Sequence, residues 1–176
     1  MSQDTSPAFP LDELDELYRE VILDHYRSPR NRAPVANPDI ASEGQNPFCG
    51  DEVAVQVRLE DRRIAQIGVQ GRGCSISTAS ASMMGELLKG KTLEEALHIS
   101  RRVREMLQGK PLPPQELEAL GDLEALRGVS KFPVRIKCAL LGWMTLEEGI
   151  EAWSKGHTPS VNTPQPPDRE GRERQA

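Results

Sequence analysis

The sequence has no long apolar run, few cysteines and no excess of positive charge. None of its apolar stretches approaches the ~20 residues of a transmembrane helix, so we expect no membrane association. Its three cysteines are an odd number that suits no disulfide framework, which favours a reducing cytoplasm. Acidic residues outnumber basic ones, 27 to 22, and this balance argues against nucleic acid as the main partner.

The composition is that of one folded domain with flanking segments. A chain of 176 residues can bury a real hydrophobic core, which we expect between residues 11 and 155. Residues 1–10 have the composition of a flexible leader, and their acidic, proline-bearing character does not match a signal peptide. Residues 156–176 are polar, rich in proline and without periodicity, so we expect a disordered tail.

The most informative stretch is 71–82, Gly-Arg-Gly-Cys followed by a segment rich in serine and alanine. A strand pattern precedes it and a helical pattern follows it, so Cys74 is expected at a strand-to-helix switch. A thiol at a helix N-terminus ionises more easily, as a nucleophile or metal ligand requires. The alternative is that Cys74 is simply a small residue packed at a crowded corner. Considered without the other cysteines, Cys74 fits this alternative better.

Two strands before this switch bring further candidates close to it. Residues 53–59 alternate apolar with polar side chains, and a turn at 61–63 leads into a second strand at 64–70. An antiparallel hairpin brings its two outer ends together. We therefore expect Cys49 and Asp51, before the first strand, to lie near Cys74, after the second.

Helical spacing predicts most of the remaining chain. A helix is expected over 11–26, loops over 35–50, a helix to Lys89, a helix from a Thr92–Glu95 capping box to Gln108, and short helical turns over 115–127. A last long helix should begin at Phe132-Pro133, with a core stripe of Ile136, Leu140, Trp143, Leu146, Ile150 and Trp153. Cys138 lies about 200° around this helix from its stripe neighbours, so it could face the corner of Cys49 and Cys74.

Other polar positions have ordinary structural interpretations. His25 is expected at a helix end, where it favours the dipole or packs against Tyr26, rather than as a ligand. The serines of 75–82 suit close helix packing better than phosphate binding, because the glycine pattern of a phosphate loop is missing. The arginines at 101, 102 and 104 indicate a solvated face, with a docking patch for an acidic partner as the alternative.

Cys49, Asp51, Cys74 and Cys138 together supply three thiolates and one carboxylate. Such a set can complete a tetrahedral zinc site, or its thiolates can hold an iron–sulfur cluster. The cysteines follow no Cys-x-x-Cys spacing, so the pattern alone does not choose between a metal site and three unrelated cysteines.

Several longer motifs add a family resemblance. The segments 17–26, 46–51, 71–84, 90–91 and 123–141 resemble the SufU branch of the IscU/NifU N-terminal family of iron–sulfur cluster assembly proteins, over essentially residues 11–153. The resemblance implies an α+β fold with a small antiparallel β-sheet packed against several helices. It also implies that Zn²⁺ is bound by Cys49, Asp51, Cys74 and Cys138.

The function implied by the resemblance is sulfur transfer. Cys49 would accept persulfide sulfur from a SufS-type cysteine desulfurase and pass it toward iron–sulfur assembly components, as a sulfurtransferase-like partner. Lys137 stands where the scaffold branch has a histidine, and residues 110–131 form an insertion that the scaffold branch lacks. Two alternatives stay open: a scaffold holding a nascent cluster on Cys49, Cys74 and Cys138, and a domain whose zinc is purely structural. The resemblance assigns no role to Arg135 or Lys137.

Overall fold

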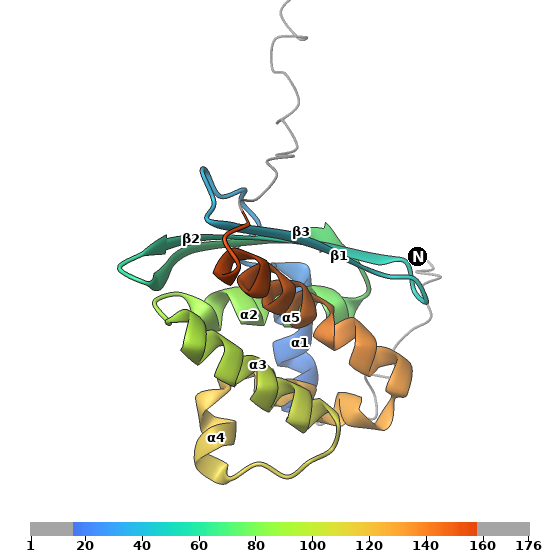
Figure 1. Cartoon of the computed structure of the whole chain (residues 1–176). Helices are drawn as coiled ribbons and strands as arrows, with labels where there is room; N and C mark the ends of the chain where they lie inside the picture. The colour runs from blue at the N-terminus through green and yellow to red at the C-terminus, as the bar shows by residue number, and fades with distance from the viewer. Residues whose placement is uncertain (1–15, 158–176) are drawn as a thin grey trace, which may run out of the picture.

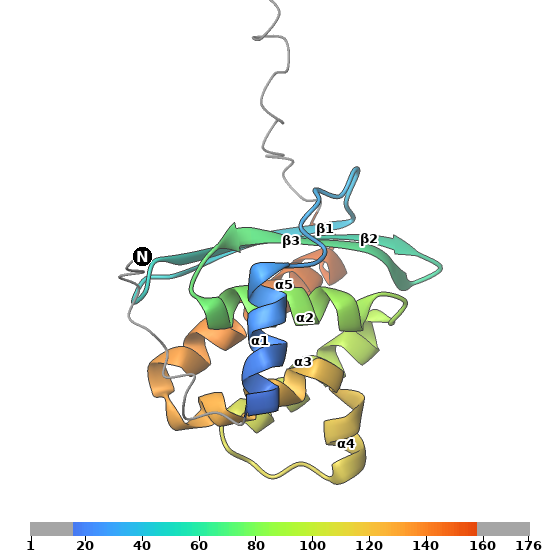
Figure 2. The same cartoon turned by 180° about the vertical axis from the view of Figure 1, so that it is seen from behind.

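The structure is a computed structural model that describes residues 16–157. Its fold is a three-stranded antiparallel sheet with the described helices on one face (Figure 1). Figure 2, from the opposite side, shows α1 crossing in front of α2 beneath the same sheet. The elements in chain order are α1 (Glu16–Arg27), β1 (Ile40–Asn46), β2 (Asp51–Glu60), β3 (Arg63–Arg72), α2 (Ser75–Leu88), α3 (Leu93–Leu107), α4 (Pro114–Ala119), the 3₁₀ helix η2 (Gly121–Lys131) and α5 (Pro133–Ser154). This is the expected α+β fold.

The predicted hairpin is present as β2 and β3. Val55 pairs with Val69 and Val57 with Ile67, so the inward apolar side chains of both strands fall in register. Asp61 and Arg62 both have positive φ, 50° and 63°, as in the turns whose twist matches that of a hairpin. At the outer end Glu52 pairs with Arg72, which brings the residues on either side of them together.

The loop predicted for residues 35–50 is wrong over β1. Within this strand Ile40 is the only apolar side chain in the buried core, so the strand lacks the alternation that a sequence pattern needs. Glycines bring β1 close to α5 instead: a Cβ at Gly149 would lie 2.8 Å from the Ile40 Cγ2 atom, and a Cβ at Gly44 would overlap Thr145. Tertiary packing and pairing with β2 therefore place this strand.

Small side chains join α2 to α5, as the serine-rich pattern predicted. Ser80 is buried, and its hydroxyl donates to the Ala139 carbonyl at 2.6 Å. The same hydroxyl accepts a hydrogen bond from the Trp143 indole at 3.2 Å. Trp143 is fully buried, so the indole N–H needs this partner.

Most described helices begin and end within a few residues of the predicted limits. The Thr92–Glu95 capping box opens α3, and α5 begins at Pro133, both as predicted. Trp153 is 40% exposed, so the core stripe of α5 ends one turn earlier than predicted. Residues 11–15 of the first predicted helix, the leader and nearly all of the predicted tail lie outside the described residues, so the domain limits at 11 and 155 stay predictions. No helix between residues 16 and 157 is long and apolar enough to cross a membrane.

His25 lies in the last turn of α1, as predicted, and its side chain is buried and hydrogen-bonded to other elements. It is 2% exposed, and its Nδ1 lies 2.8 Å from the Ser82 hydroxyl while its Nε2 lies 2.9 Å from the Asp122 carboxylate. Arg30 donates to Nδ1 at 2.8 Å, so that nitrogen accepts and Nε2 carries the proton toward Asp122. His25 thus links α1 to α2 and η2, and both of its ring nitrogens have partners within the fold.

Candidate metal centre

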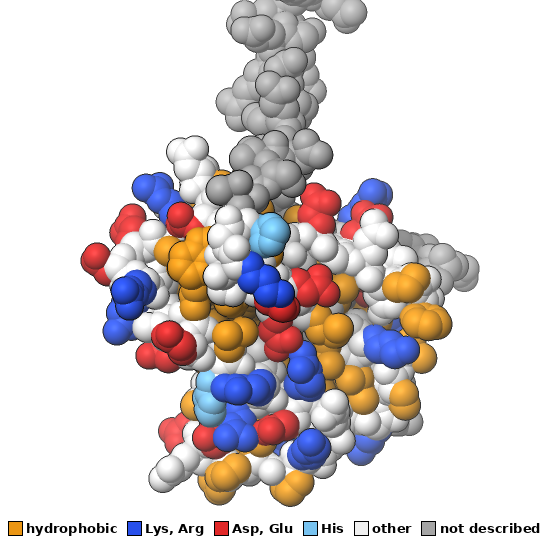
Figure 3. Space-filling view, viewed as in Figure 1, with side chains coloured by type: hydrophobic (Ala, Val, Ile, Leu, Met, Phe, Trp, Pro, Cys, Tyr) orange, Lys and Arg blue, Asp and Glu red, His pale blue; other side chains and the backbone are white. Residues whose placement is uncertain are grey.

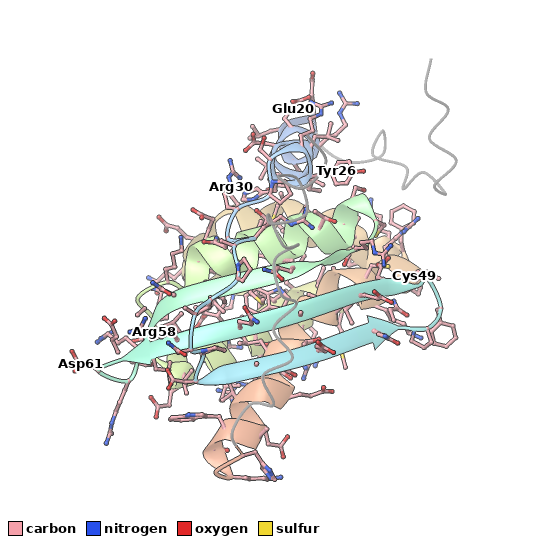
Figure 4. All side chains as sticks on the ribbon, turned by 90° about the horizontal axis from the view of Figure 1, so that it is seen from above. Glu20, Tyr26, Arg30, Cys49, Arg58 and Asp61 are labelled. Atoms are coloured by element: carbon pink, nitrogen blue, oxygen red, sulfur yellow. The ribbon has the colours of Figure 1, made fainter. Side chains whose placement is uncertain are left out.

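The four predicted ligands lie at one end of the sheet. Cys49 lies in the turn between β1 and β2, Asp51 opens β2, and Cys74 follows β3. Cys138 comes from the second turn of α5. Figure 4 shows Cys49 at the end of the sheet opposite to Asp61, which marks the hairpin turn.

The turn that carries Cys49 is organised by Asn46. The Asn46 carbonyl accepts from the Gly50 N–H at 2.8 Å, and its side-chain oxygen accepts from the Phe48 N–H at 3.1 Å. Gly50 has a φ of 71°, in the left-handed region that favours glycine. Sequence reasoning missed Asn46, although an asparagine before Pro47 is a recognised turn signal.

The predicted meeting of Cys49, Asp51 and Cys138 is confirmed. Their ligand atoms all lie within 4.8 Å of one another, and the Sγ atoms of Cys49 and Cys138 are 3.4 Å apart. Cys138 is fully buried and Asp51 is 4% exposed, whereas Cys49 is exposed. The group therefore combines two buried residues, Asp51 and Cys138, with one exposed residue, Cys49.

Cys74 borders this group rather than lying within it. Its backbone N–H donates to the Asp51 carboxylate at 3.3 Å, which places it beside the predicted ligands as expected. Its side chain caps the N-terminus of α2, where its sulfur accepts from the Ser77 N–H at 3.5 Å. A metal ion that draws all four ligand atoms inward would complete the set.

The pKa values of the Cys74 and Cys138 thiols are shifted in opposite directions. A hydrogen bond from Cys138 lowers the pKa of Cys74 to about 6, against the opposing effect of burial and with help from the Ser77 N–H. The same hydrogen bond and burial raise the pKa of Cys138. Cys74 at the helix N-terminus is thus the thiolate of the pair, as its position at the strand-to-helix switch predicted.

Asp51 supplies a test of whether a cation fits. Its Oδ2 atom is buried and has no hydrogen-bond partner among residues 16–157. A buried carboxylate oxygen without a partner is costly, and a bound cation would satisfy it. Gly73 lies beside this carboxylate and has no side chain there: a Cβ at Gly73 would lie 3.1 Å from the Asp51 Cγ atom. Three thiols, of which that of Cys138 is buried, and a hard oxygen fit zinc.

The structure also places two residues whose roles the sequence left open. Burial disfavours the charge of Arg135, but the charges and hydrogen bonds of Cys74 and Cys138 outweigh that effect and raise the pKa of Arg135. Arg135 therefore faces the thiols. The Lys137 ammonium lies 4.3 Å from the ring centroid of Phe48, the neighbour of Cys49.

The arginine run at 101–104 lies elsewhere, on α3, and is mostly paired within the fold. Arg102 contacts Glu105 at 2.7 Å and Glu116 at 3.4 Å, and Arg104 contacts Glu147 at 2.7 Å. Figure 3 shows charges of both signs side by side over this face. Arg102 and Arg104 are therefore half-buried and ion-paired, whereas Arg101 is exposed as the predicted solvated face requires.

Comparison with known proteins is consistent with this architecture. The model of the NifU-like N terminal domain family matches residues 17–139, from α1 through the buried cysteine of α5. The chain belongs to this family. The match spans all four residues of the candidate metal centre, and the expected fold class is confirmed.

Named relatives are similar over most of the domain. The chain is 49% identical over 137 residues to the Zinc-dependent sulfurtransferase SufU of Bacillus subtilis (strain 168), covering 78% of this chain and 91% of that protein. It is 41% identical over 141 residues to the Iron-sulfur cluster assembly scaffold protein IscU of Streptococcus pyogenes serotype M1, covering 80% and 87%. A crystal structure from Fervidobacterium islandicum AW-1, assigned as an iron–sulfur cluster assembly scaffold for the SUF system, matches with a TM-score of 0.69 at 34% identity, covering 74% of this chain and 94% of that one.

Proposed function

We propose that this protein is a zinc-dependent sulfur acceptor and carrier in iron–sulfur cluster assembly. The single observation that carries the proposal is the exposed sulfur of Cys49, 3.4 Å from that of buried Cys138 and beside the unpartnered oxygen of Asp51. The 49% identity with a zinc-dependent sulfurtransferase supports the same assignment.

In this proposal Cys49, Asp51, Cys74 and Cys138 hold Zn²⁺. When bound, zinc supplies charge that keeps coordinating thiols deprotonated. Three residues supply the stable part of the site, because Asp51 and Cys138 are buried and Cys74 is fixed at the start of α2. Cys49 differs from them: its turn is exposed, and its sulfur can meet another protein.

The reaction assigned to Cys49 is a thiol–persulfide exchange. The Cys49 thiolate attacks the outer sulfur of a persulfide on the partner enzyme. A sulfur–sulfur bond forms on Cys49 as the bond on the partner breaks, and the partner's cysteine leaves as a thiolate. The outer sulfur moves with no net oxidation or reduction, so no further reactant is required.

The partner that this chemistry requires is a cysteine desulfurase, and we propose one of the SufS type. Its persulfide must reach the outer end of the sheet, where Cys49 is exposed. Downstream iron–sulfur assembly components would then receive the sulfur. All three cysteines are free, which suits the cytoplasm as the proposed compartment.

Replacing Cys49 by alanine tests the acceptor role. We expect Cys49→Ala to keep much of its zinc and to bind the desulfurase, but to stimulate turnover no longer. The measurement is a titration of each variant into the desulfurase, with sulfide determined under reductant and metal on the same samples. Near-normal stimulation by Cys49→Ala would move the acceptor role to another cysteine.

A scaffold function is the second candidate, because the three thiols lie at one corner and the chain is 41% identical to an iron–sulfur scaffold protein. We expect no stable cluster to form under mild reconstitution while zinc stays bound. A cluster that survives desalting and passes intact to an apo-ferredoxin would favour the scaffold.

A further inference from the structure

Two contacts run side by side between the Cys49 turn and the start of α5. Phe48 and Cys49 are consecutive in the turn, and Lys137 and Cys138 are consecutive in the helix. The sulfurs of the two cysteines lie 3.4 Å apart, and the Lys137 ammonium lies 4.3 Å from the Phe48 ring centroid. Each member of the first pair is thus matched with one member of the second.

The Phe48 side chain is not placed by burial in the core. It is 77% exposed, the highest value among the large apolar side chains that the structure describes as exposed. Its backbone is held by Asn46, which leaves the side chain free to project along the surface. An aromatic ring in water beside an ammonium gains attraction from the ring quadrupole, at distances within about 6 Å of the centroid.

We propose that Phe48 and Lys137 form a latch that holds the Cys49 turn against α5 and sets how often the Cys49 thiol leaves the centre. Both are positioning residues, since neither offers an atom to the metal or the sulfur. The inference rests on the proposed function in one respect: it assumes that Cys49 must leave the centre to accept sulfur. The latch acts on Cys49, the exposed cysteine that follows Phe48 in the turn.

The latch predicts a measurable change in the exposure of Cys49. A cation–π contact at an exposed site changes an equilibrium by about two- to fivefold. Removing either partner should therefore raise the rate at which iodoacetamide alkylates Cys49 by about that factor.

The experiment uses the full chain as purified, with zinc content measured, and follows alkylation of each cysteine by mass spectrometry. Phe48→Leu and Lys137→Met each remove one half of the contact, and Phe48→Tyr and Lys137→Arg each preserve it. Val134→Ala is the matched control, because Val134 is another exposed apolar residue, 60% exposed, at the start of α5. Thermal unfolding of every variant checks that the fold is retained.

We expect about two- to fivefold faster alkylation of Cys49 in Phe48→Leu and in Lys137→Met. The other three variants should keep the wild-type rate. The double variant that combines Phe48→Leu with Lys137→Met should show no further gain, because both changes remove the same contact. Unchanged rates in the two disrupting variants would overturn the latch. So would accelerations that multiply in the double variant, or acceleration in Phe48→Tyr. Desulfurase stimulation by the wild-type protein is scored separately: its absence rejects the proposed function and leaves the latch result standing.

Discussion

At the scale of single residues, Cys49 is exposed and Cys138 is buried, although their sulfur atoms lie 3.4 Å apart. Cys138 is fully buried in α5, whereas Cys49 lies in an exposed turn organised by the hydrogen bonds of Asn46. Burial thus divides the work between them. Cys138 suits permanent coordination, and Cys49 suits exchange.

This division predicts different losses on substitution. Cys138→Ala and Cys74→Ala should lower zinc content and thermal stability together, because the free energy of metal binding is also folding free energy. Cys49→Ala should lose less of both. Elemental analysis and thermal unfolding of the same samples measure the two quantities. Full zinc occupancy in Cys138→Ala or Cys74→Ala would remove that residue from the site.

The buried His25 side chain should contribute strongly to the free energy of unfolding. His25→Ala should lower the free energy of unfolding by about 2–4 kcal/mol, because it leaves a cavity and takes from the buried Ser82 hydroxyl a hydrogen-bond partner. Asp122→Asn should cost less than about 1 kcal/mol, since the Asp122 side chain is 63% exposed. Urea unfolding gives both values. Equal losses in the two variants would contradict a buried role for the imidazole.

At the scale of elements, α5 is the helix that supports both the sheet and the centre. Its glycines at 142 and 149 are both buried but meet different neighbours. A Cβ at Gly149 would lie 2.8 Å from Ile40 and 3.1 Å from Ser42, whereas a Cβ at Gly142 would lie at least 3.6 Å from every neighbour. The first position fixes how closely β1 approaches, and the second does not.

Alanine at these two positions should therefore act with opposite signs. Gly149→Ala gains about 1 kcal/mol of helix propensity but is expected to lose more through overlap with β1, for a net destabilisation of about 1 kcal/mol. Gly142→Ala should stabilise the protein by about 0.5–1 kcal/mol. Urea unfolding followed by circular dichroism measures both. Stabilisation by Gly149→Ala would show that β1 can move away from α5 at little cost.

The contrast between β1 and the hairpin explains how much of the fold a sequence can predict. In β2 and β3 the strand pattern, the turn and the register are all local properties, so the pattern indicated both strands and the meeting of Cys49, Asp51 and Cys74. β1 depends on Gly149 in α5, which lies more than a hundred residues further along the chain. The position of Cys138 follows helical phase and was predictable, whereas the contact of Lys137 with Phe48 needs the shape of the turn as well.

At the scale of the whole molecule, the candidate centre joins segments that are far apart in the chain. The turn at 46–51, the start of α2 and the start of α5 meet at one end of the sheet, while α1, α3 and α4 lie away from it (Figures 1 and 4). The hydrophobic core takes side chains from the sheet and from α1, α2, α3, η2 and α5, and it extends up to this corner, where Cys74 packs against it. The domain therefore has a core that folds by burial, and a corner where thiols and a carboxylate lie together.

Metal removal should loosen the corner and leave the core folded. Free zinc at 100 times its dissociation constant adds about 2.7 kcal/mol to stability, which corresponds to about 5–10 °C in a domain of this size. We expect chelation to lower the unfolding temperature by that amount and to speed amide exchange at residues 46–51, 73–76 and 134–138. Amides in the centre of β2 and β3 should stay protected, because Val55 and Val57 are fully buried. Cys138→Ala is the control, and its unfolding temperature should not respond to chelator. Uniform loss of protection across the sheet would instead mean that the metal holds the whole fold.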